Sequence, residues 1–330
     1  MDKFRGTVSA HEACAAVADA CWELGLDADE APMSDGGEGL LDVFGGPNRT
    51  AVVTGPLGRP IEAAWRMDGR LAVVEMARAS GLLLAGGAEG NDPMLATTAG
   101  TGELIDRALE QGARHVVVGL GGSATTDGGL GALEALRTPS RLRAVEIEVA
   151  CDVRTGFVDA AAVFAPQKGA SPAQVALLTA RLQRLAGAYL DEYGVDVTAL
   201  EGAGAAGGLA GGLAALGALI VPGCELVAEH LDLPRRIAEA DVVVTGEGHL
   251  DAQSMDGKVV GAVAGWARDA GRPVVVIVGD ADADADARHA LEATGATVLS
   301  LVEREGWERA MSEPKGAIGR AAAEALAASG

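Results

Sequence analysis

The chain has 330 residues, of which 49% are hydrophobic, and a formal net charge of −21 at pH 7. This length predicts two domains with ample apolar cores. The strong negative charge argues against docking on nucleic acid or on an anionic membrane. An anionic ligand would therefore have to be held by local positive groups that act against the overall field. The 47 glycines predict many tight turns.

Neither a membrane span nor a zinc site is visible in the sequence. No run of about 20 residues is apolar throughout, and no signal peptide precedes the first motif, so we expect a cytoplasmic protein. The four cysteines show neither C-x-x-C nor zinc spacing. We expect them to be reduced and mostly buried: Cys14, Cys21, Cys151 and Cys224.

The first predicted element is a helix over residues 7–25, which begins with a capping box at Ser9 and Glu12. A polar glycine turn with the sequence SDGGEG follows at 34–39 and leads into an apolar helical pattern. Short strands with turns between them then predict a β-meander. These strands are expected at residues 52–54, 61–67 and 71–76.

Alternation of strands and helices returns after residue 97. A helix is predicted to begin near Thr98, and later helices are predicted from Pro172 to about Tyr189 and within residues 202–217. The strands in this part of the chain are rich in β-branched residues, as buried parallel strands are. They are expected at residues 115–118, 145–149, 273–278 and 297–302.

This order of elements predicts an α/β protein with two α/β domains. We expect a Rossmann- or flavodoxin-like domain with a doubly wound parallel sheet, formed by residues 1–45 and 225–330. Residues 46–224 are expected to form an inserted domain with a mixed sheet.

The most informative segment is the glycine loop, residues 119–129, with the sequence GLGGSATTDGG. It follows an apolar strand and precedes a helical pattern. Glycines let backbone N–H groups approach an anion, and a helix start adds unpaired N–H donors. Hydroxyls and a carboxylate in the same loop predict a phosphate or carboxylate cradle with a catalytic role.

Other interpretations of this loop stay open. It lacks the lysine of a Walker A loop. It does match the loose G-x-G-x-x-G/A fingerprint of dinucleotide-binding proteins, which would make the chain an oxidoreductase. The acidic residue expected about 20 positions later is poorly placed, because Glu134 is too early and Glu146 lies in the next strand. A simple strand-to-helix turn packed through its glycines is the third interpretation.

Carboxylates and cations recur beside glycine at the predicted strand and loop ends. The carboxylates are Asp35, Glu38, Asp127, Asp152, Glu247 and Asp251, and the cations are Lys3, Arg5, Lys168 and Lys258. Phosphoryl transfer needs Mg²⁺ held by carboxylates, cations on the phosphates, and a carboxylate that accepts the hydroxyl proton. The residues therefore predict a phosphate-handling α/β enzyme and leave its substrate open.

Seven segments in order resemble the signature segments of type I glycerate kinases and cover nearly the whole chain. They are DKFRG at 2–6, SDGGEG at 34–39, GTGELI at 100–105, the glycine loop, ACDV at 150–153, FAPQKGA at 164–170, and TGEGHLDAQS at 245–254 with Gly257-Lys258. The resemblance implies ATP- and Mg²⁺-dependent phosphorylation of D-glycerate to 2- or 3-phosphoglycerate. It also implies an active site in the cleft between two α/β domains, and a monomer or homodimer.

The resemblance implies a role for each matching residue. Catalysis falls to Asp127, Asp152, Lys3 and Lys168, with Asp127 and Asp152 as alternatives for the general base. Substrate binding falls to Arg5, Asp35, Gly36, Gly37, Glu38 and Ser123. Nucleotide binding falls to Gly121, Gly122, Ala124, Thr125, Thr126, Gly128, Gly129, Thr245, Gly246, Glu247 and Lys258. The implied metal ligands are Asp152, Glu247 and Asp251.

Three features depart from the family pattern. The family has a β-strand before its first motif, where this sequence has Met1, so a chain extended upstream is expected to be more stable and more active. Residues 137–145 replace a longer segment, and Thr126 stands where asparagine is usual. The first two departures leave a second function open: a weak or inactive family member that binds a nucleotide or small anion without turnover.

Overall fold

The computed structural model describes residues 1–4, 6–137, 142, 144–255, 258–281 and 286–329. The chain divides into two compact units. Met1–Asp35 together with Cys224–Gly330 form what we call the terminal unit, and Gly36–Gly223 form the inserted unit. In the described part of the chain, no helix combines the length and the apolar character needed to cross a membrane.

The terminal unit contains these elements in chain order: α1 (Ala10–Glu23), α10 (Gly223–His230, which starts at the boundary), α11 (Leu233–Glu239), β7 (Val243–Leu250), η5 (Ala252–Met255), α12 (Val259–Asp269), β8 (Val274–Ala281), α13 (Asp286–Ala293), β9 (Thr297–Ser300), α14 (Leu301–Glu305), α15 (Trp307–Ser312) and α16 (Pro314–Ser329). The predicted capping box is confirmed, because the Ser9 side chain accepts a hydrogen bond from the Glu12 backbone N–H and the Glu12 side chain accepts one from the Ser9 N–H.

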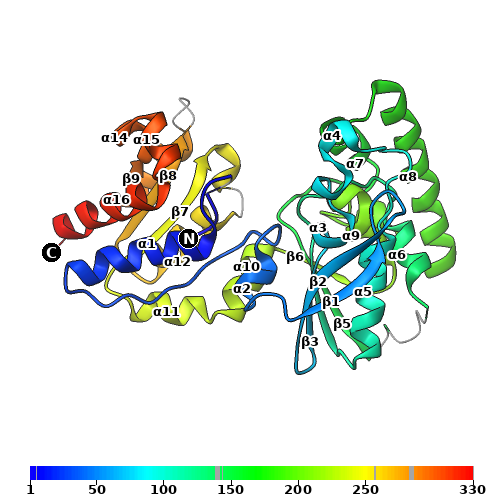
Figure 1. Ribbon diagram of the computed structural model, residues 1–330, viewed down its shortest axis with the longest axis horizontal. Helices are drawn as coiled ribbons and strands as arrows, with labels where there is room; N and C mark the ends of the chain where they lie inside the picture. The colour runs from blue at the N-terminus through cyan, green and yellow to red at the C-terminus, as the bar shows by residue number, and fades with distance from the viewer. Residues whose placement is uncertain (5, 138–141, 143, 256–257, 282–285, 330) are drawn as a thin grey trace. The chain divides into compact units, whose positions relative to one another are not determined.

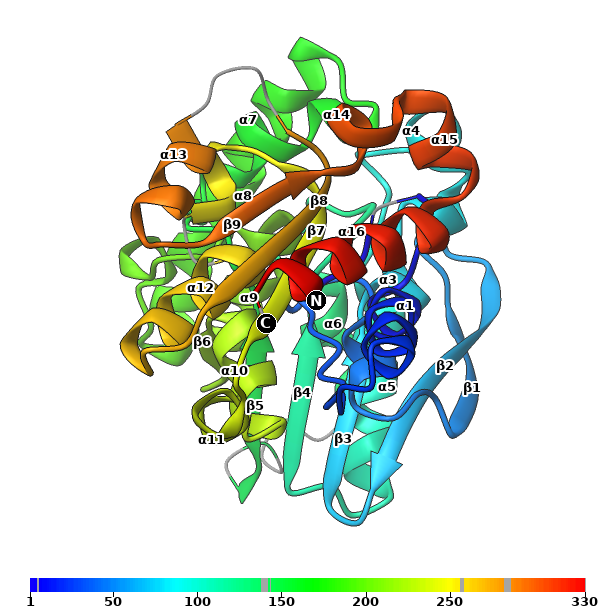
Figure 2. The same ribbon diagram turned by 90° about the vertical axis from the view of Figure 1, so that its left-hand side faces the viewer.

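A parallel sheet in the order β7-β8-β9 forms the centre of the terminal unit. Val275 and Ile277 of β8 pack with α1 and α16 into one apolar core, and Figure 2 shows these two helices side by side. Val276 and Val278 alternate with them and are fully buried on the other face. Both faces of the sheet are therefore covered, as is typical of a parallel sheet.

The inserted unit contains α2 (Leu40–Val43), β1 (Arg49–Thr54), β2 (Pro60–Asp68), β3 (Leu71–Glu75), α3 (Ala77–Ser80), η1 (Leu83–Ala85), α4 (Gly87–Gly90), α5 (Ala99–Glu110), β4 (His115–Gly119), α6 (Leu130–Ala135), β5 (Glu146–Ala150), α7 (Ala160–Phe164), η3 (Pro166–Lys168), α8 (Pro172–Tyr193), η4 (Val197–Ala199), α9 (Ala205–Ala215) and β6 (Leu219–Val221). In Figure 1 the long helix α8 runs along one side of this unit.

The sheet of the inserted unit has six strands in sequence order, β1 to β6. The first three form the predicted antiparallel meander, and β3 to β6 are parallel. Glu75, Gly119 and Ala150 lie in register at the carboxyl ends of β3, β4 and β5. The loops that follow these strands therefore leave the sheet at the same edge, where α/β proteins bind their ligands.

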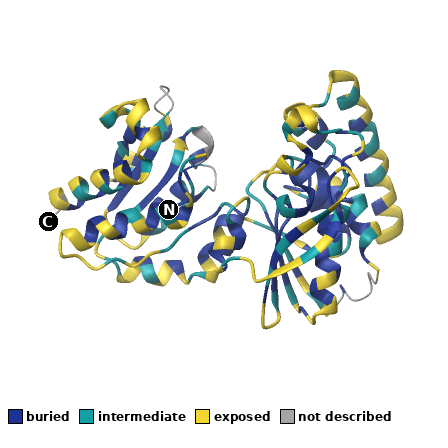
Figure 3. Cartoon of the chain, viewed as in Figure 1, coloured by how far each residue is buried: buried dark blue, intermediate teal, exposed yellow. Residues whose placement is uncertain are grey.

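Burial follows this architecture. Figure 3 shows the central strands of the sheets as largely buried, among them β3, β4 and β8, whereas β1 and β2 of the meander are more exposed. The core of the inserted unit combines Trp65, Val118 and Val149 from its sheet with Leu104 and Leu209 from α5 and α9. Together with the second parallel sheet, these layers confirm the predicted α/β class with a mixed sheet in the middle of the chain.

The strand predicted at 273–278 is observed as β8, which runs from Val274 to Ala281, and the strand predicted at 297–302 is β9, which ends at Ser300. β7 continues through Leu250, because its parallel pairing with β8 extends to Ala281. Thr245, Gly246 and Glu247 therefore lie inside a strand, although Glu247 was expected at a strand or loop end beside glycine. At the other end of this sheet the chain leaves β9 at Ser300, whose side chain caps α14 by accepting a hydrogen bond from the Glu303 N–H.

Candidate functional site

The glycine loop packs against the turn at 36–39 in the inserted unit. The Leu120 N–H donates to the Gly36 carbonyl at 3.1 Å. A Cβ at position 121 would lie 2.7 Å from Gly37 Cα, so only glycine allows this approach. Gly36 itself has φ +84° and lies against the backbone of Ala150. The structure thus brings together three predicted motifs that are far apart in the sequence.

The first part of the loop reaches solvent. Gly122 is exposed and Gly121 is half-buried, while Ser123 is 9% exposed. The loop is held here by the segment after β3, because the Leu82 N–H donates to the Gly122 carbonyl at 2.8 Å and the Ala124 N–H donates to the Ser80 carbonyl at 3.0 Å. Among the predicted nucleotide-binding glycines of the loop, Gly121 and Gly122 are therefore the accessible ones.

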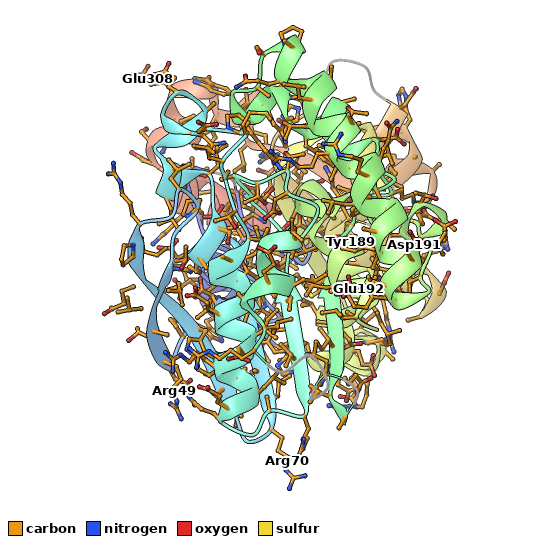
Figure 4. The ribbon with its side chains drawn as sticks, turned by 90° about the vertical axis from the view of Figure 1, so that its right-hand side faces the viewer. Arg49, Arg70, Tyr189, Asp191, Glu192 and Glu308 are labelled. Atoms are coloured by element: carbon orange, nitrogen blue, oxygen red, sulfur yellow. The ribbon has the colours of Figure 1, made fainter. Side chains whose placement is uncertain are left out.

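The last part of the loop is packed into the unit. The Gly128 N–H donates to the Gly207 carbonyl at 3.0 Å, and the Tyr189 hydroxyl donates to the Gly128 carbonyl at 3.0 Å. Tyr189 lies buried on α8 next to the exposed Asp191 and Glu192, all three labelled in Figure 4. Gly129 has φ +81°, and a Cβ there would lie 3.2 Å from Gly212 Cα. These two glycines serve chain packing.

Asp127 is a buried connector between loop and helices. Its Oδ2 accepts hydrogen bonds from the Thr98 N–H and hydroxyl, both at 2.8 Å, and from the Gly131 N–H at 3.3 Å. Its Oδ1 accepts from the Gly129 N–H at 3.1 Å. Asp127 is only 7% exposed. The carboxylate therefore joins the starts of α5 and α6, and its lone pairs are engaged within the protein.

Lys168 lies beneath the same loop. It is 2% exposed, and its Nζ donates to the Thr125 carbonyl at 2.6 Å. Burial lowers the pKa of this ammonium to about 7, and the charge of Asp127 opposes that shift. The neighbouring Thr126 is fully buried, and its hydroxyl has no hydrogen-bond partner among the described residues. Lys168 thus holds the loop by a backbone carbonyl.

Acidic groups at the strand ends complete the inserted unit's part of the site. Asp152 is half-buried after β5, and its Oδ1 accepts from the Gly223 N–H at 2.8 Å. Glu38 is exposed in the 36–39 turn. Glu75 is 2% exposed; its Oε1 accepts from the Leu41 N–H at 2.8 Å, and its Oε2 pairs with Arg78 at 3.0 Å.

In the terminal unit, Lys3 lies between two carboxylates. Its Nζ is 3.4 Å from Asp35 Oδ1 and 3.6 Å from Asp2 Oδ1. Burial raises the pKa of Asp2, with Lys3 acting in the opposite direction. The predicted residues Lys3 and Asp35 therefore contact each other, and Asp2, which was not predicted, belongs to the same cluster. Arg5, the other predicted cation of this motif, lies outside the described residues.

The second cluster of the terminal unit lies in β7 and in the segment directly after it. Glu247 is 8% exposed, its Oε1 accepts no hydrogen bond from the described residues, and burial raises the pKa of the carboxyl to about 7. Asp251 Oδ1 accepts from the Ser254 N–H at 3.0 Å and lies 3.6 Å from Lys258 Nζ. Thr245 is fully buried, and a Cβ at Gly246 would lie 2.0 Å from the Ile277 carbonyl oxygen, so these two residues belong to the sheet interior.

The terminal unit also has a cavity of about 620 Å³ between α1, α11 and β7. None of the predicted site residues lines it. Its walls combine apolar residues such as Cys14 and Ile237 with charged residues such as Asp29 and Arg236. The cavity is thus separate from the predicted chemistry.

Sequence reasoning missed several residues that interact with the predicted site residues of one unit or the other. The clearest are Asp2, Glu75, Arg78, Asn91 and Thr98. One signal was available for Glu75, because it ends the buried strand β3 in the register of Gly119. For Asn91 and Thr98 we find no local signal, since their partners in the loop lie about 30 residues or more further along the chain.

The chain matches the model of the glycerate kinase family over residues 1–138 and 137–329. It is 37% identical over 342 residues to glycerate 2-kinase of Escherichia coli K12, an alignment that covers 91% of this chain and 90% of the relative. It is 38% identical to glycerate kinase of Bacillus subtilis 168 over 92% and 90% of the two chains. An uncharacterized protein of Mycobacterium tuberculosis CDC 1551 is 42% identical over 92% of this chain and 84% of its own.

A solved structure agrees with these matches. A crystal structure assigned as glycerate kinase 2 of Salmonella typhimurium LT2 superposes with a TM-score of 0.78 and 32% identity, and the alignment covers 99% of this chain and 97% of the other. Family model, curated relatives and three-dimensional likeness all extend over nearly the full length. The chain therefore belongs to the glycerate kinase family.

Proposed function

We propose that this protein transfers the γ-phosphoryl group of ATP to a hydroxyl of D-glycerate. The oxygen–phosphorus bond to ADP breaks, a bond from the glycerate oxygen forms, and the hydroxyl proton leaves to a base. The observation that carries the proposal is the glycine loop, packed against the 36–39 turn at the carboxyl edge of the sheet, in a chain that matches the family along its length.

The exposed start of the loop supports a role in holding phosphate. Gly121 and Gly122 leave backbone accessible, and no described residue accepts a hydrogen bond from their N–H groups. Backbone donors of this kind suit phosphate oxygens because they are fixed in place before the ligand arrives. Arg78, with 41% of its side chain exposed in α3, would add positive charge nearby in a protein whose net charge is negative.

The predicted carboxylates differ in how well they could bind Mg²⁺. The described residues contain no ready-made group of three or more His, Cys, Asp or Glu around a metal position. Mg²⁺ is commonly bound by one or two carboxylates and the substrate's phosphates, so such a cage is not required. Glu247, whose buried Oε1 accepts no hydrogen bond from a described residue, fits that role. Asp251 Oδ1 is already engaged with Ser254 and Lys258, and Asp152 Oδ1 with the Gly223 N–H. When bound, the ion would neutralise charge on the phosphate oxygens.

The geometry favours Asp152 over Asp127 as the base. A general base has to reach the proton it accepts. Asp152 is half-buried after β5, whereas Asp127 is 7% exposed and accepts four hydrogen bonds from the protein. We therefore assign proton acceptance to Asp152 and give Asp127 a positioning role.

The experiment is an assay of purified protein with D-glycerate, ATP and Mg²⁺, followed by phosphorus NMR of the product. Because the E. coli relative is named a glycerate 2-kinase, we expect ADP release with 2-phosphoglycerate as the product. A signal from 3-phosphoglycerate would show that the other hydroxyl is phosphorylated, and the proposed kinase activity itself would still hold. Intact nucleotide binding without any ADP release would instead support the binding-protein alternative.

A further inference from the structure

Two side chains from outside the glycine loop hold its buried middle. Asn91, directly after α4, donates through Nδ2 to the Ala124 carbonyl at 3.0 Å and to the Lys168 carbonyl at 2.9 Å. Lys168 Nζ donates to the next carbonyl of the loop, that of Thr125, at 2.6 Å. Two successive carbonyls are therefore held by donors from two other segments of the inserted unit.

The chemistry of the amide fixes which way Asn91 points. A carboxamide has two N–H donors on one side and only acceptors on the other. If the amide were flipped, Oδ1 would face the carbonyl oxygens of Ala124 and Lys168 at hydrogen-bond distance, which is repulsive. In the observed orientation both N–H groups are used, and the buried Oδ1 accepts no hydrogen bond from the described residues. No smaller or acidic side chain reproduces these two bonds.

This arrangement sets the direction of the neighbouring N–H groups. In a planar trans peptide the N–H points opposite to the carbonyl, and the described backbone has no cis bond. The N–H groups of Thr125 and Thr126 therefore point away from Asn91 and Lys168. Both threonines are fully buried, and neither N–H donates a hydrogen bond to a described residue.

Unpaired buried donors are costly, so a loop that keeps them needs support from outside. Part of this support comes from α9, because the Thr125 hydroxyl donates a hydrogen bond to the Ala206 carbonyl at 3.3 Å. The strongest support is on the side of Asn91, which touches both the loop and the segment that carries Lys168. Breaking its two bonds would free the Ala124–Thr125 peptide to rotate.

We propose that Asn91 is a positioning residue for phosphoryl transfer: it fixes the Ala124 and Lys168 carbonyls together, and so holds the glycine loop in the conformation in which the accessible N–H groups of Gly121 and Gly122 can meet an anionic phosphate. This rests on the proposed kinase function. Asn91 acts through the loop and is not itself a catalytic residue.

The test compares two asparagines of the inserted unit. Asn48 also makes two main-chain hydrogen bonds, both with Met67 at 3.0 Å, but it lies in the meander away from the loop. Asn91→Ala and Asn48→Ala should lose similar amounts of thermal stability. We expect only Asn91→Ala to lower kcat/KM for ATP, by roughly 10- to 100-fold, because two hydrogen bonds that orient the loop are lost. Equal kinetics in the two variants would overturn the proposal.

Asn91→Asp gives a second measurement that does not depend on the stability of Asn91→Ala. The ionised carboxylate only accepts hydrogen bonds and would face two carbonyls, whereas the protonated form donates one O–H. Burial raises the pKa of such a carboxyl. The rate relative to wild type at the same pH should therefore rise by about threefold or more from pH 8 to pH 6 as the carboxyl gains its proton. A flat ratio would contradict the proposal.

The role of Asn91 can be tested even if the proposed kinase function is wrong. If the wild-type protein does not phosphorylate glycerate, the kinase proposal fails, and the rise in melting temperature on adding ATP decides the role of Asn91. Asn91→Ala must then reduce that rise while Asn48→Ala preserves it. An unchanged rise in both variants would reduce Asn91 to a purely structural residue.

Discussion

Glu247 lies in β7 with 8% of its surface exposed, and burial raises the pKa of its carboxyl from 4.5 to about 7. The folded state then binds more protons than the unfolded state between these two values. The free energy of unfolding therefore falls as the pH rises through this window. This stabilising contribution is complete below pH 4.5 and is lost above about pH 7.

Glu247→Gln should remove this pH dependence. An amide cannot ionise, so the variant is expected to gain ~2 kcal/mol relative to wild type between pH 5 and pH 8. Urea unfolding at the two pH values measures the change. The same difference in stability at both pH values would show that Glu247 does not titrate in this range.

Ala206 lowers the stability of the protein through backbone strain. In α9 the residues Ala206, Gly207 and Gly208 have left-handed backbone angles, and Ala206 has φ 53° and ψ 38°. A Cβ in this conformation costs roughly 1–2 kcal/mol, which glycine avoids. The turn places the Gly207 carbonyl on the Gly128 N–H, so the strain is held next to the glycine loop.

Ala206→Gly should raise the free energy of unfolding by ~1 kcal/mol, because strain is relieved at a small entropic cost. Ala210→Gly, in the helical part of α9, is the matched control and should lower it by ~1 kcal/mol. Urea denaturation of both variants measures this. A loss of stability in Ala206→Gly would mean that its methyl contacts outweigh the strain.

At the scale of elements, Asp127 decides how two helices begin. It accepts from Thr98, which precedes α5, and from Gly129 and Gly131 at the start of α6. The Thr98 hydroxyl in turn accepts from the Ala132 N–H at 2.9 Å. Anionic groups are favourable at helix N-termini, so a structural role explains this carboxylate without a reacting substrate.

The pair Asp127→Asn and Asp152→Asn separates the two roles. Asp127→Asn turns an N–H toward existing donors and should cost ~3 kcal/mol of stability. Asp152→Asn should leave the melting temperature nearly unchanged and lower kcat by about 100-fold or more, as loss of a general base does. Unfolding curves and an ADP-release assay give both quantities. If Asp127→Asn instead kept its stability and lost kcat, while Asp152→Asn lost stability, Asp127 would be the general base.

Strand ends are the elements that local pattern misjudged. Glu247 was expected at a strand or loop end beside glycine, but β7 continues past it through Leu250. Gly246 is required inside the strand because a Cβ there would meet the Ile277 carbonyl oxygen. A glycine needed for close packing and a glycine needed for a turn look the same in the sequence.

At the scale of the whole molecule, the inserted unit is one continuous segment whose ends meet. A Cβ on Gly36 would lie 2.9 Å from Gly223 Cα. The unit has its own six-stranded sheet and apolar core. Adjacent ends and a separate core are the usual properties of a domain that folds on its own.

Residues 36–223 expressed alone should therefore unfold cooperatively, as a single domain does. The measurement is thermal unfolding followed by circular dichroism in the near and far ultraviolet, which should give coincident transitions. As the complementary control, residues 1–35 can be joined to 224–330 through a short glycine linker. A gradual transition of the inserted unit alone would show that its core depends on the rest of the chain.

The order of amino acids was enough to predict the α/β class, the meander, the capping box at Ser9 and the glycine loop, because each depends on neighbours within a few residues. It also carried the family motifs. It could not show that Asp127 is engaged by Thr98, that Asn91 and Lys168 hold the loop, or that burial shifts the pKa of Glu247. Those properties arise from hydrogen-bond partners and desolvation supplied by distant segments, which only the folded chain brings together.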